Sequence, residues 1–124
     1  MLSINYKDPR PIYEQVRDAL RQLILSGAIA PGEKLPSVRE LAASLAINPN
    51  TIQRSYRELE SLGLINTVPG KGAFAATDGV AAHRRMQELT DQLTATIQEL
   101  KLLGLGREDV LAAADAAYGK EEEP

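Results

Sequence analysis

Two helix-start signals stand close together in the middle of the chain, at Ser37 and Asn48. Ser37 is followed three residues later by Glu40, which is the pattern of a capping box, and Asn48 precedes Pro49, a residue suited to the first position of a helix. Between the two signals there is room for a helix of only about two turns and a short connection over 46–48. The chain is therefore predicted to contain two short helices joined by a tight turn.

Apolar residues recur every three or four positions around these signals, as they do on the buried face of a helix. A further stripe of this kind predicts an earlier helix over 11–26, where Pro11 suits the first turn and Gly27 suits the C-cap. The two later helices are expected over 37–45 and 49–62. The side chains expected to be buried in the three helices are Ile12, Val16, Leu20, Leu23 and Ile24, then Val38, Leu41, Ala42 and Leu45, then Ile52, Tyr56, Leu59 and Leu62.

A short β-hairpin is predicted directly after the third helix. Residues 64–68 and 73–76 have strand character, and the turn between them, 69–72, contains two glycines and Lys71. Three helices followed by a two-stranded hairpin are typical of a winged helix-turn-helix. The expected fold class is therefore mainly α (α+β), with a winged helix-turn-helix domain over 1–78.

A second pattern begins after the hinge-like residues 77–79. Helices are expected over 80–103 and 107–118, followed by a disordered tail over 119–124. In the shorter helix the side chains expected to point inward are Val110, Leu111, Ala114 and Tyr118. In the longer helix an imperfect heptad stripe is formed by Met86, Leu89, Leu93, Ile97, Leu100 and Leu103.

The apolar stripe over 86–103 requires a partner surface in water. We therefore expect 79–118 to form a two-helix dimerisation region that makes the protein a homodimer. The alternative is that the long helix folds back onto its own N-terminal domain.

Composition narrows the function classes. The chain has 124 residues, no Cys and a single His, His83, so disulfides, thiolate catalysis and a two-His metal site within one chain are excluded. No nucleophile–base pair is recognisable, and neither an enzyme, a metal site nor a cofactor is expected. No apolar run reaches the length of a membrane span, and residues 1–10 do not resemble a signal peptide. The expected location is the cytoplasm, with no membrane partner.

The net charge of −3 is unevenly distributed. Residues 1–78 contain nine Lys or Arg and eight Asp or Glu, whereas residues 79–124 contain five and nine. A nearly neutral N-terminal domain can still present a basic face to a nucleic acid, so the net charge does not exclude such a partner.

Polar side chains open the helix over 49–62, where a winged helix-turn-helix contacts the major groove of DNA. Asn50 and Gln53 can pair bidentately with adenine, Arg54 can pair with guanine, and Thr51 can contact the methyl group of thymine. The alternative is that these are ordinary solvent-facing helix positions without a role in binding. Their place at the start of the second helix of the pair favours contact with bases, so double-stranded DNA is the expected partner.

Backbone contacts with DNA are predicted around this helix. At the hairpin tip, Gly72 lets the backbone approach closely and Lys71 supplies positive charge for phosphate or the minor groove. A phosphate-binding P-loop is excluded there, because the spacing is wrong and Gly72 replaces the required Ser or Thr. Lys34, Ser37 and Arg39 are the remaining predicted phosphate contacts.

Two groups of charged residues have alternative interpretations. Arg39 could pair with the carboxylate of Glu33 or Glu40 instead of holding a phosphate. The arginines outside the predicted interface are expected to form a solvated face: Arg10, Arg17 and Arg21.

Five ordered segments resemble the GntR family of bacterial transcription regulators, and most closely its YtrA subfamily. The resemblance covers residues 4–76 without an obvious gap. The matching segments are 11–16 (PIYEQV), 32–42 (GEKLPSVRELA), 48–60 (NPNTIQRSYRELE), 63–65 (GLI) and 70–74 (GKGAF).

The resemblance implies a winged helix-turn-helix homodimer that binds a palindromic operator, usually as a repressor. The subfamily implies a short helical dimerisation region and, often, control of ABC-transporter genes. The family's DNA-facing positions coincide with the residues named above: Lys34, Ser37, Arg39, Asn50, Thr51, Gln53, Arg54, Lys71 and Gly72.

The sequence departs from the family at two places. Many members have Arg at the position of Gln53, and many have Arg where Val68-Pro69 stands here. The family's base preference is therefore not transferred, and a less basic wing is expected. No small-molecule effector is identified, because two short helices enclose little volume for a pocket; the open alternative is a ligand site at the dimer interface. The alternative function is a winged helix that binds a protein partner without touching DNA.

Overall fold

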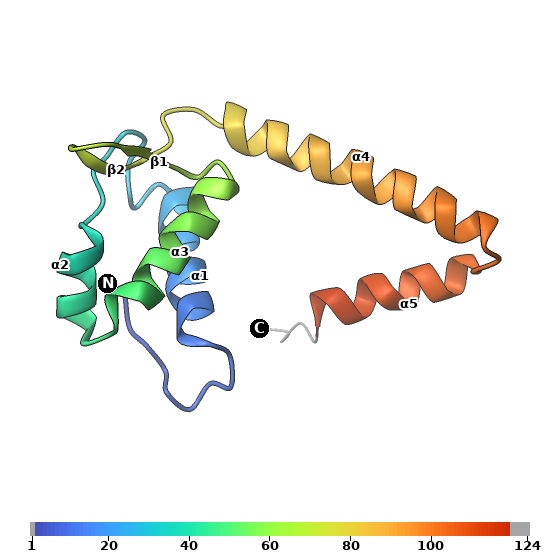
Figure 1. Ribbon diagram of the computed structural model, residues 1–124, viewed down its shortest axis with the longest axis horizontal. Coiled ribbons are helices and arrows are strands. Elements are labelled where there is room, and N and C mark those ends of the chain that lie inside the picture. The colour runs from blue at the N-terminus through green and yellow to red at the C-terminus, as the bar shows by residue number, and fades with distance from the viewer. Residues whose placement is uncertain (1, 120–124) are drawn as a thin grey trace. The chain divides into compact units, whose positions relative to one another are not determined.

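The computed structural model describes residues 2–119 and, within them, contains five helices and one two-stranded antiparallel sheet (Figure 1). The order of elements confirms the predicted winged helix-turn-helix followed by two further helices. The elements are α1 (Ile12–Ser26), α2 (Val38–Leu45), α3 (Pro49–Ser61), β1 (Ile65–Val68), β2 (Gly72–Ala75), α4 (Val80–Leu102) and α5 (Arg107–Tyr118).

The chain divides into two compact units, Met1–Arg85 and Met86–Pro124. The first turn of α4 belongs to the first unit, where Ala82 packs against the core. The predicted domain boundary after residue 78 stays a prediction. Apart from Gly119, the predicted tail over 119–124 lies outside the described residues.

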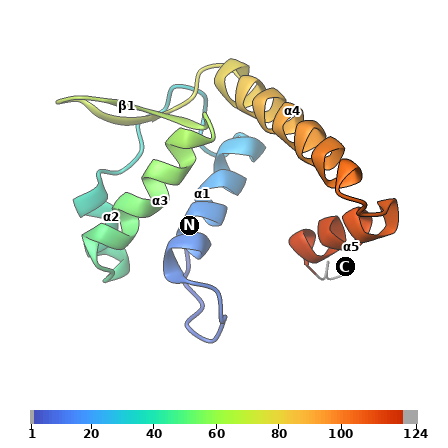
Figure 2. The same ribbon diagram turned by 45° about the vertical axis from the view of Figure 1, so that its right-hand side comes forward.

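The first unit is built around one apolar core. α1 and α3 make the most extensive contacts between helices, α2 also packs on α3, and the hairpin lies at one end of the three helices (Figure 2). Burial of apolar surface at this meeting point is the main source of stability. The core side chains are Val16, Leu20, Leu35, Leu41, Ala42, Ile52, Tyr56, Leu59, Leu64, Ile65, Ala73 and Ala75.

Local capping signals set the helix-turn-helix as predicted. The Ser37 side chain accepts a hydrogen bond from the Glu40 amide at 3.0 Å, and the Glu40 carboxylate accepts one from the Ser37 amide. The Asn48 side chain accepts from the Asn50 amide at 2.8 Å. Between these caps Ala46 takes the left-handed conformation with φ of 56°, which turns the chain from α2 towards α3.

The wing is tied to the segment that leads into α2. In the hairpin Val68 pairs with Gly72 and Ile65 pairs with Ala75. The Leu35 amide donates to the Ala73 carbonyl, and the Ala75 amide donates to the Glu33 carbonyl, both at 2.9 Å. Residues 33–35 therefore run beside β2 like a third strand and hold the wing against the helix-turn-helix.

Some predicted boundaries are shifted by one residue. The first strand begins at Ile65 because the Leu64 amide is still bonded to the Leu59 carbonyl at the exit of α3. The second strand begins at Gly72, which pairs with Val68, and ends at Ala75. Pro11 is the N-cap of α1 and stands just before its first turn, because its ψ of 147° is extended.

The second unit has a different character. No residue of α4 or α5 is buried. The prediction that Leu111, Ala114 and Tyr118 point inward is wrong for the single chain, because all three are exposed, Leu111 to 56% and Tyr118 to 82%, whereas Val110 is half-buried. Two helices without a third layer cannot enclose their apolar side chains.

The described part of the chain also bears on membrane and metal sites. Residues 2–119 contain no helix that is long and apolar enough to cross a membrane. Over the same residues, no group of three His, Asp or Glu side chains is arranged to hold a metal ion.

Candidate nucleic-acid interface

The predicted base-reading residues occupy the exposed start of α3. Asn50, Gln53 and Arg54 are exposed, and Thr51 is half-buried. The opposite face of the helix, with Ile52, Ser55, Tyr56 and Leu59, is buried in the core. The amphipathic pattern of α3 therefore leaves its polar side chains free to meet a ligand.

Ser55 and Tyr56 fix α3 in place from its buried face. The Ser55 hydroxyl donates to the carbonyl of Tyr13 in α1 at 2.8 Å, and the Tyr56 hydroxyl donates to the Pro36 carbonyl at 2.6 Å. Burial, with a smaller contribution from Glu40, raises the pKa of Tyr56 to about 12. Tyr56 thus keeps its proton, and both hydroxyls link α3 to neighbouring segments.

The start of α2 presents two of the predicted phosphate ligands. Ser37 and Arg39 are exposed. The Ser37 oxygen accepts the capping bond from Glu40, and its O–H is still available to donate to a phosphate. Among the described residues Arg39 forms no ion pair, since Glu33 and Glu40 instead accept bonds from the Ala30 and Ser37 amides. The alternative in which Arg39 pairs with either carboxylate is therefore not seen.

The wing brings Lys34 and Gly72 together. A β-carbon added at Gly72, whose φ is 118°, would lie 3.0 Å from Cε of Lys34. The positive φ favours glycine at this position, and a larger residue would also displace the end of the Lys34 side chain. Lys71 is exposed next to this pair at the hairpin tip, where its amide closes the turn on the Val68 carbonyl.

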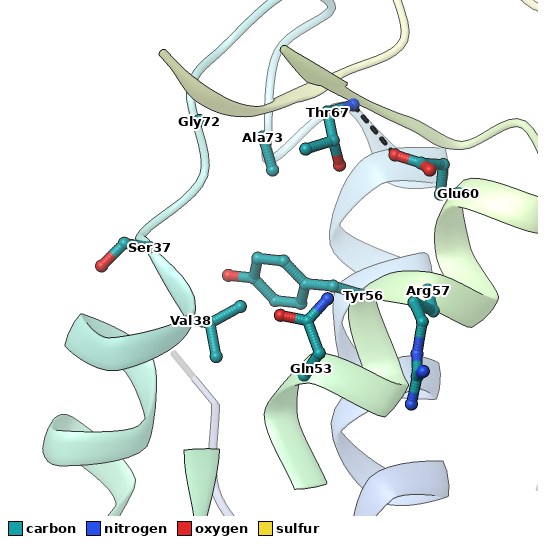
Figure 3. Close-up of a pocket in the computed structure, with 9 residues that line it drawn as sticks. All are labelled: Ser37, Val38, Gln53, Tyr56, Arg57, Glu60, Thr67, Gly72 and Ala73. Atoms are coloured by element: carbon teal, nitrogen blue, oxygen red, sulfur yellow. Dashed lines mark hydrogen bonds between the residues drawn. The ribbon is translucent and has the colours of Figure 1, made fainter. Parts of the chain in front are cut away.

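A hollow of about 260 Å³ lies between α2, α3 and the wing (Figure 3). It brings three predicted site residues, Ser37, Gln53 and Gly72, to one place. Two of its other lining residues, Thr67 and Glu60, were not singled out from the sequence. Their link is the hydrogen bond from the Thr67 amide to the Glu60 carboxylate at 3.0 Å, which joins the wing to α3.

Arg54 is held by two neighbours that the sequence analysis did not connect with it. Its guanidinium carbon lies 3.6 Å from the centre of the Tyr13 ring, a cation–π contact. Its Nε lies 3.5 Å from a carboxylate oxygen of Glu58. Glu58 lies four residues after Arg54 on the same helix, a spacing that could have predicted this ion pair from the sequence. Tyr13 lies 41 positions before Arg54, and no sequence pattern predicts the contact between them.

The three arginines expected to form a solvated face, Arg10, Arg17 and Arg21, are partly exposed, but Arg10 and Arg17 are also held in ion pairs. Arg17 bonds Asp18 at 2.9 Å and reaches across to Glu58 of α3 at 2.7 Å, which raises the pKa of its guanidinium. Arg10 bonds Asp8 and Asp18, each at 3.0 Å, and the bond from Arg10 also lowers the pKa of the Asp8 carboxyl. These charges join α1 to α3 and to the lead-in segment.

The amino-acid sequence matches the model of the gntR family of bacterial regulatory proteins over residues 12–75. This segment spans α1 to β2, the whole winged helix-turn-helix just described. The chain belongs to the GntR family. Among curated proteins, the regulator is 38% identical to the HTH-type transcriptional regulator YhcF of Bacillus subtilis, over 86% of this chain and 88% of YhcF. It is 36% identical to the HTH-type transcriptional repressor YtrA of the same organism, over 85% of this chain and 82% of YtrA.

Solved structures agree with this assignment of the GntR regulator. YtrA from Sulfolobus acidocaldarius, a GntR-family transcription factor, matches with a TM-score of 0.59 and 30% identity, over 77% of this chain and 97% of the other. The DNA-binding domain of AraR in complex with operator ORE1 matches with a TM-score of 0.53 and 30% identity, over 61% and 93%. The likeness supports both the predicted fold class and the predicted YtrA-like kind of regulator.

Proposed function

We propose that this GntR regulator is a repressor that binds a palindromic operator as a homodimer. The observation that carries the proposal is the exposed polar start of α3, with Asn50, Gln53 and Arg54 presented opposite the buried face of the helix. In a winged helix-turn-helix this part of the second helix enters the major groove. The structural match to a DNA-binding domain in complex with its operator also supports a role in binding operator DNA.

The proposed contacts fall into two groups. Base edges are read by Asn50, Thr51, Gln53 and Arg54, whose side chains have the donor and acceptor sets that suit adenine, thymine and guanine. The sugar–phosphate backbone is held by residues at the start of α2 and on the wing, which supply charge or close approach without reading sequence. This second group comprises Lys34, Ser37, Arg39, Lys71 and Gly72.

The proposed dimer rests on the apolar side chains of α4. Met86, Leu89 and Leu93 are 65%, 42% and 58% exposed, and Leu103 just beyond the helix is 79% exposed. Ile97 and Leu100 complete the stripe and are half-buried. A row of this kind is unfavourable in water and is covered when two copies associate. A twofold axis would set two copies of α3 about 34 Å apart, one turn of DNA, or a multiple of it.

The sign of regulation and the target genes rest on resemblance. One relative that matches over most of its length is named a transcriptional repressor, and the YtrA-like character implies control of ABC-transporter genes. We therefore propose repression of transporter genes by a dimer bound at an inverted repeat, in the cytoplasm and without a cofactor.

Selection of bound fragments from genomic DNA at about 150 mM salt tests the proposal, because non-specific phosphate binding is weak under that condition. The expected result is an enriched inverted repeat whose half-sites lie about 10 base pairs apart, centre to centre, or a multiple of that. A folded dimer that enriches no sequence, even when cell extract is added to supply an effector, would favour the alternative of a protein partner.

Two variants then separate the proposed kinds of contact. Asn50→Ala should weaken operator binding by about 1–3 kcal/mol and relax the preference at one base pair. Lys71→Ala should weaken operator and random DNA alike and reduce the salt slope by about one unit. Identical behaviour of the two variants on specific and random DNA would contradict the division.

A further inference from the structure

We infer that Tyr13, on α1, is a positioning residue that orients the Arg54 guanidinium for bidentate recognition of a guanine. The inference rests on the proposed function, because it assigns Arg54 to a base. Tyr13 lies outside the helix-turn-helix itself and is not among the DNA-facing residues assigned above. Its effect on DNA would be exerted entirely through Arg54.

The Tyr13 ring covers one face of the guanidinium. The central carbon of Arg54 lies 3.6 Å from the ring centre, close enough for stacking as well as for a cation–π contact. The backbone that carries the ring is held against α3, because the Tyr13 main-chain carbonyl accepts the hydroxyl hydrogen of Ser55 at 2.8 Å. Ser55 follows Arg54 directly in α3, so this bond keeps the backbone at Tyr13 close to the backbone at Arg54.

A second neighbour occupies one edge of the guanidinium. Nε of Arg54 lies 3.5 Å from Oε2 of Glu58, and Oε1 of Glu58 is bonded to Arg17 at 2.7 Å. Glu58 is thus also held by Arg17 of α1. Together the ring and the carboxylate restrict both the plane and the rotation of the guanidinium.

The free edge of Arg54 is the one that guanine needs. Among the described residues the two terminal nitrogens of Arg54 have no partner, and the side chain remains 55% exposed. Guanine offers two acceptors, O6 and N7, to a bidentate arginine. A guanidinium already oriented by its neighbours loses less freedom when it forms those two bonds.

The competing interpretation is that the stack with Tyr13 is a resting place which DNA must disrupt. The two interpretations predict opposite signs. If Tyr13 positions Arg54, removal of the ring weakens operator binding; if Tyr13 sequesters Arg54, removal strengthens it.

The test compares variants on the selected operator and on a scrambled duplex by fluorescence anisotropy at about 150 mM salt, where specific and non-specific binding separate. Tyr13→Leu should weaken operator binding about 5- to 20-fold, within the range for one bidentate base pair, and leave scrambled DNA unchanged. Tyr13→Phe keeps the ring and should bind the operator like the wild type. Tyr6→Leu is the matched control, because this tyrosine is 71% exposed and forms no stack.

Two further measurements distinguish positioning from a general loss of structure. In the Arg54→Ala background, Tyr13→Leu should cause no additional loss, because its effect passes through Arg54. With single base-pair changes across the operator, Tyr13→Leu and Arg54→Ala should flatten the preference at the same position. A thermal melt of each variant reports whether the fold is retained.

Unchanged or tighter operator binding by Tyr13→Leu would overturn the inference while leaving the proposed function intact. The same holds for a loss that is equal on operator and scrambled DNA, or for failure of Tyr13→Phe to rescue. Absence of any preferred sequence for the wild-type protein would instead remove the proposed function, and the inference with it.

Discussion

The two units of the molecule are built from similar residues but differ in burial. The first unit encloses twelve apolar side chains in its core, whereas α4 and α5 contain no buried residue. Fully burying one such side chain contributes about 1.5–3 kcal/mol, and α5, with 12 residues, has a length at which an isolated helix is marginal in water. The contrast indicates that the first unit has a core of its own within one chain, whereas the apolar side chains of the second unit stay exposed in the single chain and motivate the proposed dimer.

The largest effect on this difference between the two units is expected from a change in the apolar stripe of α4. Leu93→Glu should raise the dissociation constant of the proposed dimer at least about 100-fold, about 3 kcal/mol, because two like charges would meet in an apolar seam. Sedimentation measures the effect, and the melting of the first unit should not change. Gln98→Glu adds the same charge on the opposite side of α4 and should leave the dimer intact. A dimer that survives Leu93→Glu would place the interface elsewhere.

Gly63 tests how closely the first turn of α4 packs against the rest of the first unit. Gly63 has φ of +76°, and a β-carbon there would lie 2.6 Å from the backbone of Ala81 and Ala82. Gly63→Ala should therefore lower the free energy of unfolding by about 2–3 kcal/mol, from both clash and strain.

Gly27→Ala is the matched control for Gly63→Ala. Gly27 has a similar φ of +84° and nothing within 4 Å of the added carbon, so only the strain of about 1 kcal/mol is expected. Denaturant unfolding of the two variants isolates the contact with α4. Equal losses would show that the first turn of α4 moves away freely.

Tyr56 tests how much a buried hydrogen bond contributes to the stability of the first unit. Tyr56→Phe removes the bond to the Pro36 carbonyl and should lower stability by about 1–2 kcal/mol at neutral pH. Because burial raises the pKa of Tyr56 to about 12, the unfolded chain loses this proton first as the pH rises above about 10. The contribution of Tyr56 to the free energy of unfolding is therefore fully present below about pH 10 and is lost as the pH rises towards 12.

Urea unfolding between neutral pH and pH 12 checks this expectation. The decline above pH 10 should be shallower in Tyr56→Phe than in the wild type. Tyr6→Phe, at an exposed tyrosine, should retain the full decline. An unchanged slope in Tyr56→Phe would mean that this buried hydroxyl does not govern the alkaline loss.

The smallest effect is expected in the turn between α2 and α3. Ala46 has φ of 56°, a conformation that glycine adopts without strain, so Ala46→Gly should stabilise the first unit by about 0.5–1 kcal/mol. Ala43→Gly, inside α2, should instead destabilise it by about 0.5–1 kcal/mol. Calorimetric melting compares the two variants, and a loss of stability in Ala46→Gly would contradict the strain argument.

Most of the fold could be predicted from the sequence because its signals are local. The capping box at Ser37, the Asn48-Pro49 start and Gly27 each act within a few residues, and the structure confirms the helices they delimit. Strand ends were less accurate, because whether Leu64 joins the helix exit or the strand depends on a bond to Leu59.

The candidate site could be predicted only in part. The exposed polar start of α3 follows from its amphipathic pattern, since the apolar positions identify the buried face. The stacking of Tyr13 on Arg54 could not be predicted, because Tyr13 lies on α1, far from Arg54 in the sequence. Arg17 illustrates the limit: its sequence neighbours suggest solvent, but Glu58 of α3 lies 2.7 Å away.

The order and approximate limits of the helices and the GntR-type helix-turn-helix follow from the amino-acid sequence alone, because caps, turns and apolar spacing depend on near neighbours. The contacts between residues far apart in the sequence are known only from the packing of the folded chain. It placed Tyr13 on Arg54, Lys34 across Gly72, and Asn5 on the buried Gln15. Those contacts depend on how α1 and the wing pack against the helix-turn-helix, and packing of distant segments leaves no periodic mark along the chain.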